Sequence, residues 1–178
     1  TSGRIIVEGY NGRPQIETSG LLFYTGCTLW AFENLKLVLD ATAPAYPTFG
    51  QFNSAVNTGK NLIVDLNGND AGTGLTIHIA RDVEIRNTGG GAAGTGMGFS
   101  PVSFGGEFIG CVAHNLRGDG FRLGATMPHC SHCISEGNGR HGWQITSNQS
   151  GYGLSLVNCT SNGNGGDGIE VTAADGIA

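Results

Sequence analysis

The fold is decided by three segments, CVAHNLRGDGFRLG (111–124), CISEGNGRHGWQIT (133–146) and CTSNGNGGDGIEVT (159–172), which align without a gap. Each begins with a cysteine, and nine residues later comes a glycine followed by a large apolar residue: Gly120-Phe121, Gly142-Trp143 and Gly168-Ile169. The segments start 22 and 26 residues apart (133 − 111 and 159 − 133). A repeat of this length is typical of a solenoid, in which each unit buries its apolar face by stacking on the next.

Inward and outward positions alternate within each segment, as they do in β-strands. The expected inward columns are Phe108/Cys130/Leu156, Cys111/Cys133/Cys159, Ala113/Ser135/Ser161, Phe121/Trp143/Ile169 and Leu123/Ile145/Val171. Glycine and asparagine, which tolerate left-handed backbone, separate the strands, and Asn158 is expected in a turn column with Gly110 and His132. The pattern predicts an all-β parallel β-helix of six to seven coils of 22–26 residues, because a leucine-rich repeat or a propeller would need another frame or period.

Composition agrees with a folded domain and limits its partners. The net charge is −5 and only 13% of the residues are charged, so a nucleic-acid-binding surface is not expected. Glycine is abundant, at 32 of 178 residues, but the hydrophobic fraction of 39% allows a core. No apolar run is long enough to span a membrane. We expect one domain, 1–178, that is a fragment of a longer chain, because the last repeat ends without a polar cap.

Shorter strand patterns extend the repeat towards the N-terminus. They cover Arg4–Glu8, Leu21–Tyr24, Leu29–Leu39, Asn61–Leu66, Leu75–Ile79 and Val83–Ile85. Ile63, Ile85 and Cys111 are separated by the same 22 and 26 residues (85 − 63 and 111 − 85), which predicts that they stack. The period lapses over 41–60, where prolines and aromatic residues predict a loop excursion. Tyr46 of this loop is a candidate for stacking on a sugar ring.

Two stretches resemble the repeats of a known group of proteins. Asn138-Gly139-Arg140-His141-Gly142-Trp143 and Asn162-Gly163-Asn164-Gly165-Gly166-Asp167-Gly168-Ile169 are similar to repeats of right-handed parallel β-helix proteins: polysaccharide lyases, mannuronan C5-epimerases, and bacteriophage tailspikes and appendages. The resemblance implies a right-handed, single-stranded β-helix, an extracellular or virion location and a polysaccharide partner. Such proteins are often homotrimers. These motifs specify fold better than reaction.

Outward columns are where chemistry is expected. They are His114/Glu136/Asn162, Asp119/His141/Asp167 and Arg122/Gln144/Glu170. With strands about 4.8 Å apart, His141 would lie between Asp119 and Asp167, which makes these three residues the catalytic candidates, with His141 as general acid or base. Alternatively, the two aspartates would lie about 9–10 Å apart, as the carboxylates of inverting glycosidases do. A third interpretation is that the position before the glycine is a turn position that favours aspartate. The charged side chains of the column would then only keep the surface hydrated.

The remaining site predictions concern binding. The expected substrate-binding residues are Arg122, Arg140, Glu136, Gln144, Glu170 and Tyr46. No cofactor and no metal ion is expected: the glycine tract 88–98 does not open a helix, and in His129-Cys130-Ser131-His132-Cys133 both cysteines belong to inward columns. Five cysteines cannot all pair, and the three in one column are read as small core residues.

Three functions remain open at this stage. The first is a carbohydrate-recognising domain of a tailspike or appendage, which could also cleave its ligand. The second is a secreted polysaccharide lyase, glycoside hydrolase or epimerase, although the Asp-Pro-His motif of the epimerases and the arginine motifs of the pectate lyases are missing. The third is a purely structural β-helix. Incubation with a panel of polysaccharides separates them.

Overall fold

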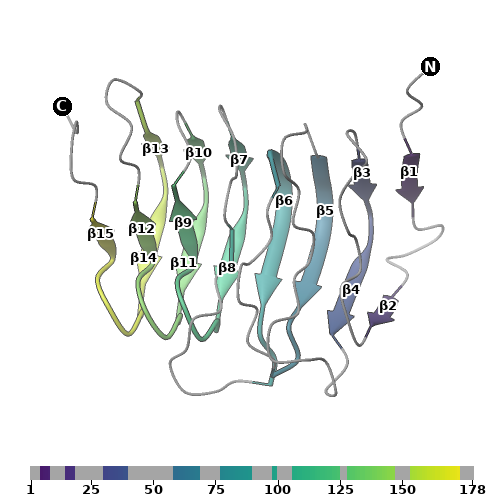
Figure 1. Cartoon of the computed structure of the whole chain (residues 1–178), viewed down its shortest axis with the longest axis horizontal. Helices are drawn as coiled ribbons and strands as arrows, with labels where there is room; N and C mark the ends of the chain where they lie inside the picture. Colours follow the sequence, from purple (N-terminus) through teal and green to yellow (C-terminus); the bar gives the residue numbers. More distant parts are fainter. Residues whose placement is uncertain are drawn as a thin grey trace.

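The protein is a parallel β-solenoid. A computed structural model describes residues 5–8, 15–18, 30–39, 58–68, 77–89, 98–99, 106–124, 128–146 and 153–172. In this part of the chain every element is a strand and all paired strands are parallel, so the predicted fold class is confirmed. The strands stack side by side along the long axis, from the N-terminal to the C-terminal end (Figure 1). No helix among these residues could span a membrane.

Two sheets line the solenoid. The larger contains β1 (Ile5–Glu8), β2 (Gln15–Thr18), β3 (Trp30–Glu33), β4 (Lys36–Leu39), β5 (Thr58–Asp65), β6 (Ile79–Arg86), β7 (Glu107–Ile109), β8 (Val112–His114), β10 (His129–Ser131), β11 (Ile134–Glu136), β13 (Ser155–Val157) and β14 (Thr160–Asn162). The smaller contains β9 (Phe121–Leu123), β12 (Trp143–Ile145) and β15 (Ile169–Val171). In the larger sheet, β5 pairs with both β3 and β4, and β6 with both β7 and β8, so these long strands continue through a corner.

The solenoid has about three turns, so the prediction of six to seven coils is too high. The regular spacing behind that prediction belongs to the three aligned segments, and these are the segments that supply β9, β12 and β15 to the smaller sheet. The larger sheet continues towards the N-terminus through β6, β5, β3 and β1. Leu21–Tyr24 and residues 40–57 lie outside the described residues, and residues 58–60 of the expected loop 41–60 belong to β5.

Strand register confirms the predicted columns of the three segments. Directly paired residues include Phe108/Cys130/Leu156, Ala113/Ser135/Ser161, Phe121/Trp143/Ile169 and Leu123/Ile145/Val171. The earlier stacking prediction is wrong, because Ile85 pairs with Val64 and Ala113. Ile63 and Val64 are both apolar, so periodicity could not choose between them. Val64 is the buried one, and Ile63 faces outward.

One corner of the solenoid uses left-handed backbone at the same position in successive coils. The residues with positive φ at this corner are Asn34, Asn61, Asp82, Gly110, His132 and Asn158. Asparagine and aspartate adopt this conformation at lower cost than most residues. The turn column predicted for Asn158, Gly110 and His132 is therefore confirmed. Asn34 also divides the expected strand Leu29–Leu39 into β3 and β4, whereas β6 continues through Asp82.

Aromatic rings and thiols fill the core. Trp143 stacks on Phe121 with ring centroids 4.0 Å apart, and Phe121 stacks on Phe99 at 4.7 Å. Cys111, Cys130 and Cys133 are buried, as the inward columns predict, and Cys159 is half-buried at the last described coil. Burial raises the pKa of the Cys111 and Cys130 thiols, so these two cysteines are uncharged core residues.

An inward polar network joins the two sheets at the second corner. Asn138 Oδ1 accepts a hydrogen bond from the Leu116 amide at 3.1 Å, and Asn138 Nδ2 donates one to Ser135 Oγ at 2.9 Å. Ser135 Oγ in turn donates to the Gly142 carbonyl at 2.8 Å. A Cβ at Gly120 would collide with Ser135 Oγ, which explains why glycine precedes the large apolar residue. The hydrogen bonds satisfy polar groups that would be costly to bury unpaired.

Candidate functional site

The column Asp119/His141/Asp167 is a ladder of hydrogen-bond acceptors. Asp119 Oδ1 accepts the backbone N–H of His141 at 3.1 Å, and His141 Nδ1 accepts the backbone N–H of Asp167 at 3.0 Å. The side chains of Asp119 and His141 therefore each accept a hydrogen bond from a backbone amide of the next coil. The Asp119 carboxylate is 1% exposed, whereas that of Asp167 is 73% exposed. Part of the preference for aspartate or histidine before the glycine is thus structural.

His141 lies at the centre of a polar cluster on the smaller sheet. Its Nε2 is 3.3 Å from Glu170 Oε2, and its Nδ1 is 3.9 Å from Asp167 Oδ2. Gln144 on β12 pairs with Glu170 on β15, and its Nε2 donates to Glu170 Oε2 at 2.8 Å. Because Nδ1 accepts a hydrogen bond from the Asp167 amide, the proton of the neutral ring is assigned to Nε2, which faces Glu170.

The other predicted site residues are distributed over several surfaces. Arg122 on β9 pairs with Gln144, so it extends the row of the smaller sheet. Arg140 Nη1 lies 3.7 Å from Asp119 Oδ2. Glu136 belongs to β11 of the larger sheet, and Tyr46 lies outside the described residues. The catalytic roles of His141, Asp119 and Asp167 and the binding roles of the other residues stay predictions.

Acid–base chemistry at His141 would require a rearrangement. Its Nδ1 is used by the Asp167 amide and its Nε2–H faces Glu170, so the neutral ring has no unshared lone pair in this arrangement. Glu170 is held by contacts from both His141 and Gln144. His141, Asp167 and Glu170 each place one potential ligand atom within 4.8 Å of the others, which is a geometry that could hold a metal ion.

A second polar surface runs along the larger sheet, and we call it the axial row. It consists of Asp65, Arg86, His114, Glu136 and Asn162, one each from β5, β6, β8, β11 and β14. Adjacent members are directly paired across the strands. The row therefore follows the solenoid axis at the strand spacing of about 4.8 Å. It extends the predicted column His114/Glu136/Asn162 by two residues.

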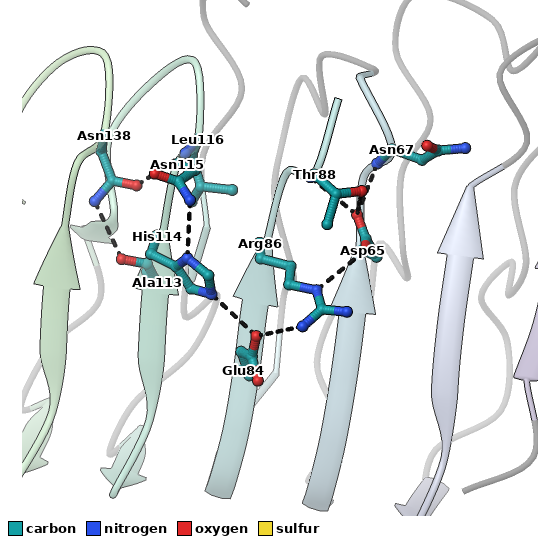
Figure 2. A network of polar contacts seen from close by, with 10 residues as sticks. All are labelled: Asp65, Asn67, Glu84, Arg86, Thr88, Ala113, His114, Asn115, Leu116 and Asn138. Carbon is teal, nitrogen blue, oxygen red and sulfur yellow. Dashed lines mark hydrogen bonds and ion pairs between the residues drawn. The ribbon is translucent and has the colours of Figure 1, made fainter. Parts of the chain in front are cut away.

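Hydrogen bonds and ion pairs connect the buried end of the axial row (Figure 2). Arg86 Nε is 3.0 Å from Asp65 Oδ2, and Arg86 Nη1 is 3.0 Å from Glu84 Oε1. His114 Nε2 also lies 3.0 Å from Glu84 Oε1, and its Nδ1 contacts the Asn115 side-chain amide at 3.2 Å. At the exposed end, Asn162 Nδ2 donates to Glu136 Oε1 at 3.2 Å. Contacts within the protein thus hold each end of the row in place.

This network keeps two carboxylates ionised. Burial opposes ionisation of Asp65, but hydrogen bonds from the amides of Asn67 and Thr88 and from Arg86 outweigh it and hold the pKa below its ordinary value of 3.8. For Glu84, burial is likewise outweighed, here by His114 and Arg86, and the pKa lies below its ordinary value of 4.5. Arg86 is therefore flanked by two anions across the neutral pH range.

Acid should destabilise the protein through these groups. A carboxylate whose pKa is lowered by folding contributes stability above its unfolded pKa and loses it as the pH falls through its folded pKa. We therefore expect the thermal midpoint to decrease from about pH 4.5 downward, with much of the loss below about pH 3.8. Melting curves of the parent protein and Asp65→Asn should show a shallower acid dependence in the variant. An equal slope in both would contradict the assignment.

Sequence reasoning missed Asp65, Glu84 and Arg86 as members of a polar surface. Both strands were expected, but the pairing of Ile63 with Ile85 put Asp65 and Arg86 out of register by one residue. A one-residue shift turns every side chain to the other face of a strand. The alternation in Val83-Glu84-Ile85-Arg86 was the available signal, because it places both charged residues on the outward face.

Comparison with known proteins does not add a family. No family model, no curated protein and no solved structure matches the chain.

Proposed function

We propose that this domain binds an extended polysaccharide along the axial row, as in the tailspike and appendage proteins that its repeats resemble. The observation that carries the proposal is the continuity of the row: five polar side chains follow the solenoid axis, one from each of five paired strands. A linear polymer also presents its hydrogen-bonding groups at a regular spacing. A rigid, regularly spaced row is suited to bind such a ligand with little loss of conformational freedom.

The chemistry of the axial row fits sugar hydroxyls. Arg86 offers donors, Glu136 offers acceptors, and Asn162 offers both, whereas Asp65 is buried and holds Arg86 in place. Val112 and Ile134 form the neighbouring outward row on β8 and β11, and Ile134 is exposed. An apolar strip beside a polar row can contact the C–H faces of sugar rings while hydroxyls bond to the polar side chains.

The alternative of a polysaccharide lyase, glycoside hydrolase or epimerase stays a prediction centred on His141. Its support is the ordered contact between His141 and Glu170. Release of reducing ends or of unsaturated products from a polysaccharide panel, lost in His141→Ala, would favour it. For a binding domain we expect no product, an extracellular or virion location and, as in many tailspikes, a homotrimer, which sedimentation would test. A purely structural β-helix would neither bind nor cleave.

Substitutions in the exposed part of the axial row test the binding proposal. We expect Glu136→Ala and Asn162→Ala each to weaken binding to the preferred polysaccharide about five- to tenfold, the cost of losing one or two hydrogen bonds. Both side chains reach the surface, so the fold should be retained. Affinities are measured by titration after a panel of bacterial and algal polysaccharides has identified a ligand.

Arg81→Gln is the matched control, because Arg81 lies on the same sheet, is exposed and belongs to another outward row. Its affinity should equal that of the parent protein. Equal weakening in the control and in both row variants would show that the axial row has no special role in binding and contradict the proposal. If neither row variant affects binding, the ligand binds to another face of the solenoid.

A further inference from the structure

We propose that His141 and Glu170 form a binding site for a divalent transition-metal ion, with Zn²⁺ as the best-fitting example. The two residues come from the turn before β12 and from β15, so the site joins neighbouring coils. The donor set combines an imidazole nitrogen with carboxylate oxygens. Imidazole favours zinc and similar ions, whereas calcium and magnesium prefer all-oxygen sites.

Distance is the first support. His141 Nε2 and Glu170 Oε2 are 3.3 Å apart. With zinc–ligand distances of about 2.1 Å, two ligand atoms at this separation subtend an angle of about 105° at the ion, close to the tetrahedral value. Asp167 Oδ2 lies 3.9 Å from His141 Nδ1 on a largely exposed side chain. The two main ligand atoms therefore need little movement once the ring proton has left Nε2.

Gln144 gives the second, independent support. Its side-chain amide contacts Glu170 through Nε2, yet its Oε1 is buried and has no hydrogen-bond partner among the described residues. The residue as a whole is only 7% exposed. A buried carbonyl oxygen without a partner is costly. Rotation of the amide would exchange Oε1 and Nε2, which breaks the bond from Nε2 to Glu170 and places Oε1 where a cation could bind it as a third ligand.

Metal binding at Nε2 also has a consistent proton assignment. The ion would take the Nε2 lone pair, so the proton of the neutral ring would move to Nδ1. There the Asp167 carboxylate, 3.9 Å away, can accept it, and the hydrogen bond from the Asp167 amide to Nδ1 would break. A carboxylate that orients a metal-binding histidine in this way is a common arrangement. Asp167 is then a positioning residue.

Titration of the full chain, after treatment with a chelator, tests the site. We expect isothermal titration calorimetry with ZnCl₂ to show one equivalent bound, together with a raised thermal midpoint, and CaCl₂ to produce neither effect. Glu170→Gln keeps the shape of the side chain and should weaken zinc binding at least about tenfold. Gln144→Met should weaken it less, because it removes only the third ligand.

His132→Asn is the control, because His132 is exposed at a corner position where asparagine already occurs in other coils. Its zinc affinity should equal that of the parent protein. The proposal is overturned if zinc does not bind, if Glu170→Gln binds it as tightly as the parent protein, or if calcium binds equally well. If binding is lost in His132→Asn, the site lies at that surface histidine instead.

Discussion

Replacing Trp143 by alanine should lower the free energy of unfolding by about 4 kcal/mol, as truncation of a buried aromatic side chain in a packed core does. The indole is 1% exposed and stacks on Phe121 with the rings 4.0 Å apart and almost parallel. Its removal would leave a cavity between coils that the rigid strand spacing cannot close. Urea unfolding followed by far-ultraviolet circular dichroism measures the change.

Two variants keep this test interpretable. Trp143→Phe retains a stacked ring and should cost only about 1–2 kcal/mol, so it reports on the site if the alanine variant fails to fold. Ile169→Ala changes the next residue of the same column, but Ile169 is 54% exposed and should cost less than about 1.5 kcal/mol. Equal losses in Trp143→Ala and Ile169→Ala would contradict the position of the stack.

Asn138→Leu should cost about 3 kcal/mol, because it leaves the buried Leu116 amide without its acceptor and removes the contact with Ser135. The first coil carries Ala113 and Leu116 where the second carries Ser135 and Asn138. The apolar pair is therefore compatible with this corner. We expect the double variant Ser135→Ala/Asn138→Leu to be more stable than the sum of the single effects implies, by about 1 kcal/mol.

A double-mutant cycle in urea measures this coupling. Asn162→Ala is the control, because Asn162 is exposed on the outward face and should change stability by less than about 0.5 kcal/mol. Strict additivity of the Ser135 and Asn138 effects would show that their hydrogen bond contributes nothing. A loss in Asn162→Ala as large as that in Asn138→Leu would contradict the inward position of Asn138.

The three aligned segments made the core predictable. Phe121, Trp143 and Ile169 could be placed in one column because the repeat has no gaps and because inward residues alternate along a strand. Upstream, strands were recognised but their register was not. Ile63 and Val64 are adjacent and both apolar, so the sequence did not show which of them faces inward. Without that register, the axial row could not be predicted.

The candidate site was predictable only in part. The outward columns brought His141, Gln144 and Glu170 to one face, and the structure brings these three side chains together. Asp119 was expected at the surface but is buried, because its carboxylate binds the His141 amide of the next coil. Alternation along a strand says nothing about a turn, where side chains can fold back onto the backbone.

The sequence by itself determined the repeat, the parallel β-solenoid and the inward columns, because a side-chain period of two and regular corner residues are local properties of the chain. Only the tertiary structure decided which polar residues meet. The contacts of Arg86 with Asp65 and of His141 with Glu170 join residues that are 21 and 29 positions apart (86 − 65 and 170 − 141). Such contacts depend on the register between coils and on the path of each corner, and a one-residue change in either separates them.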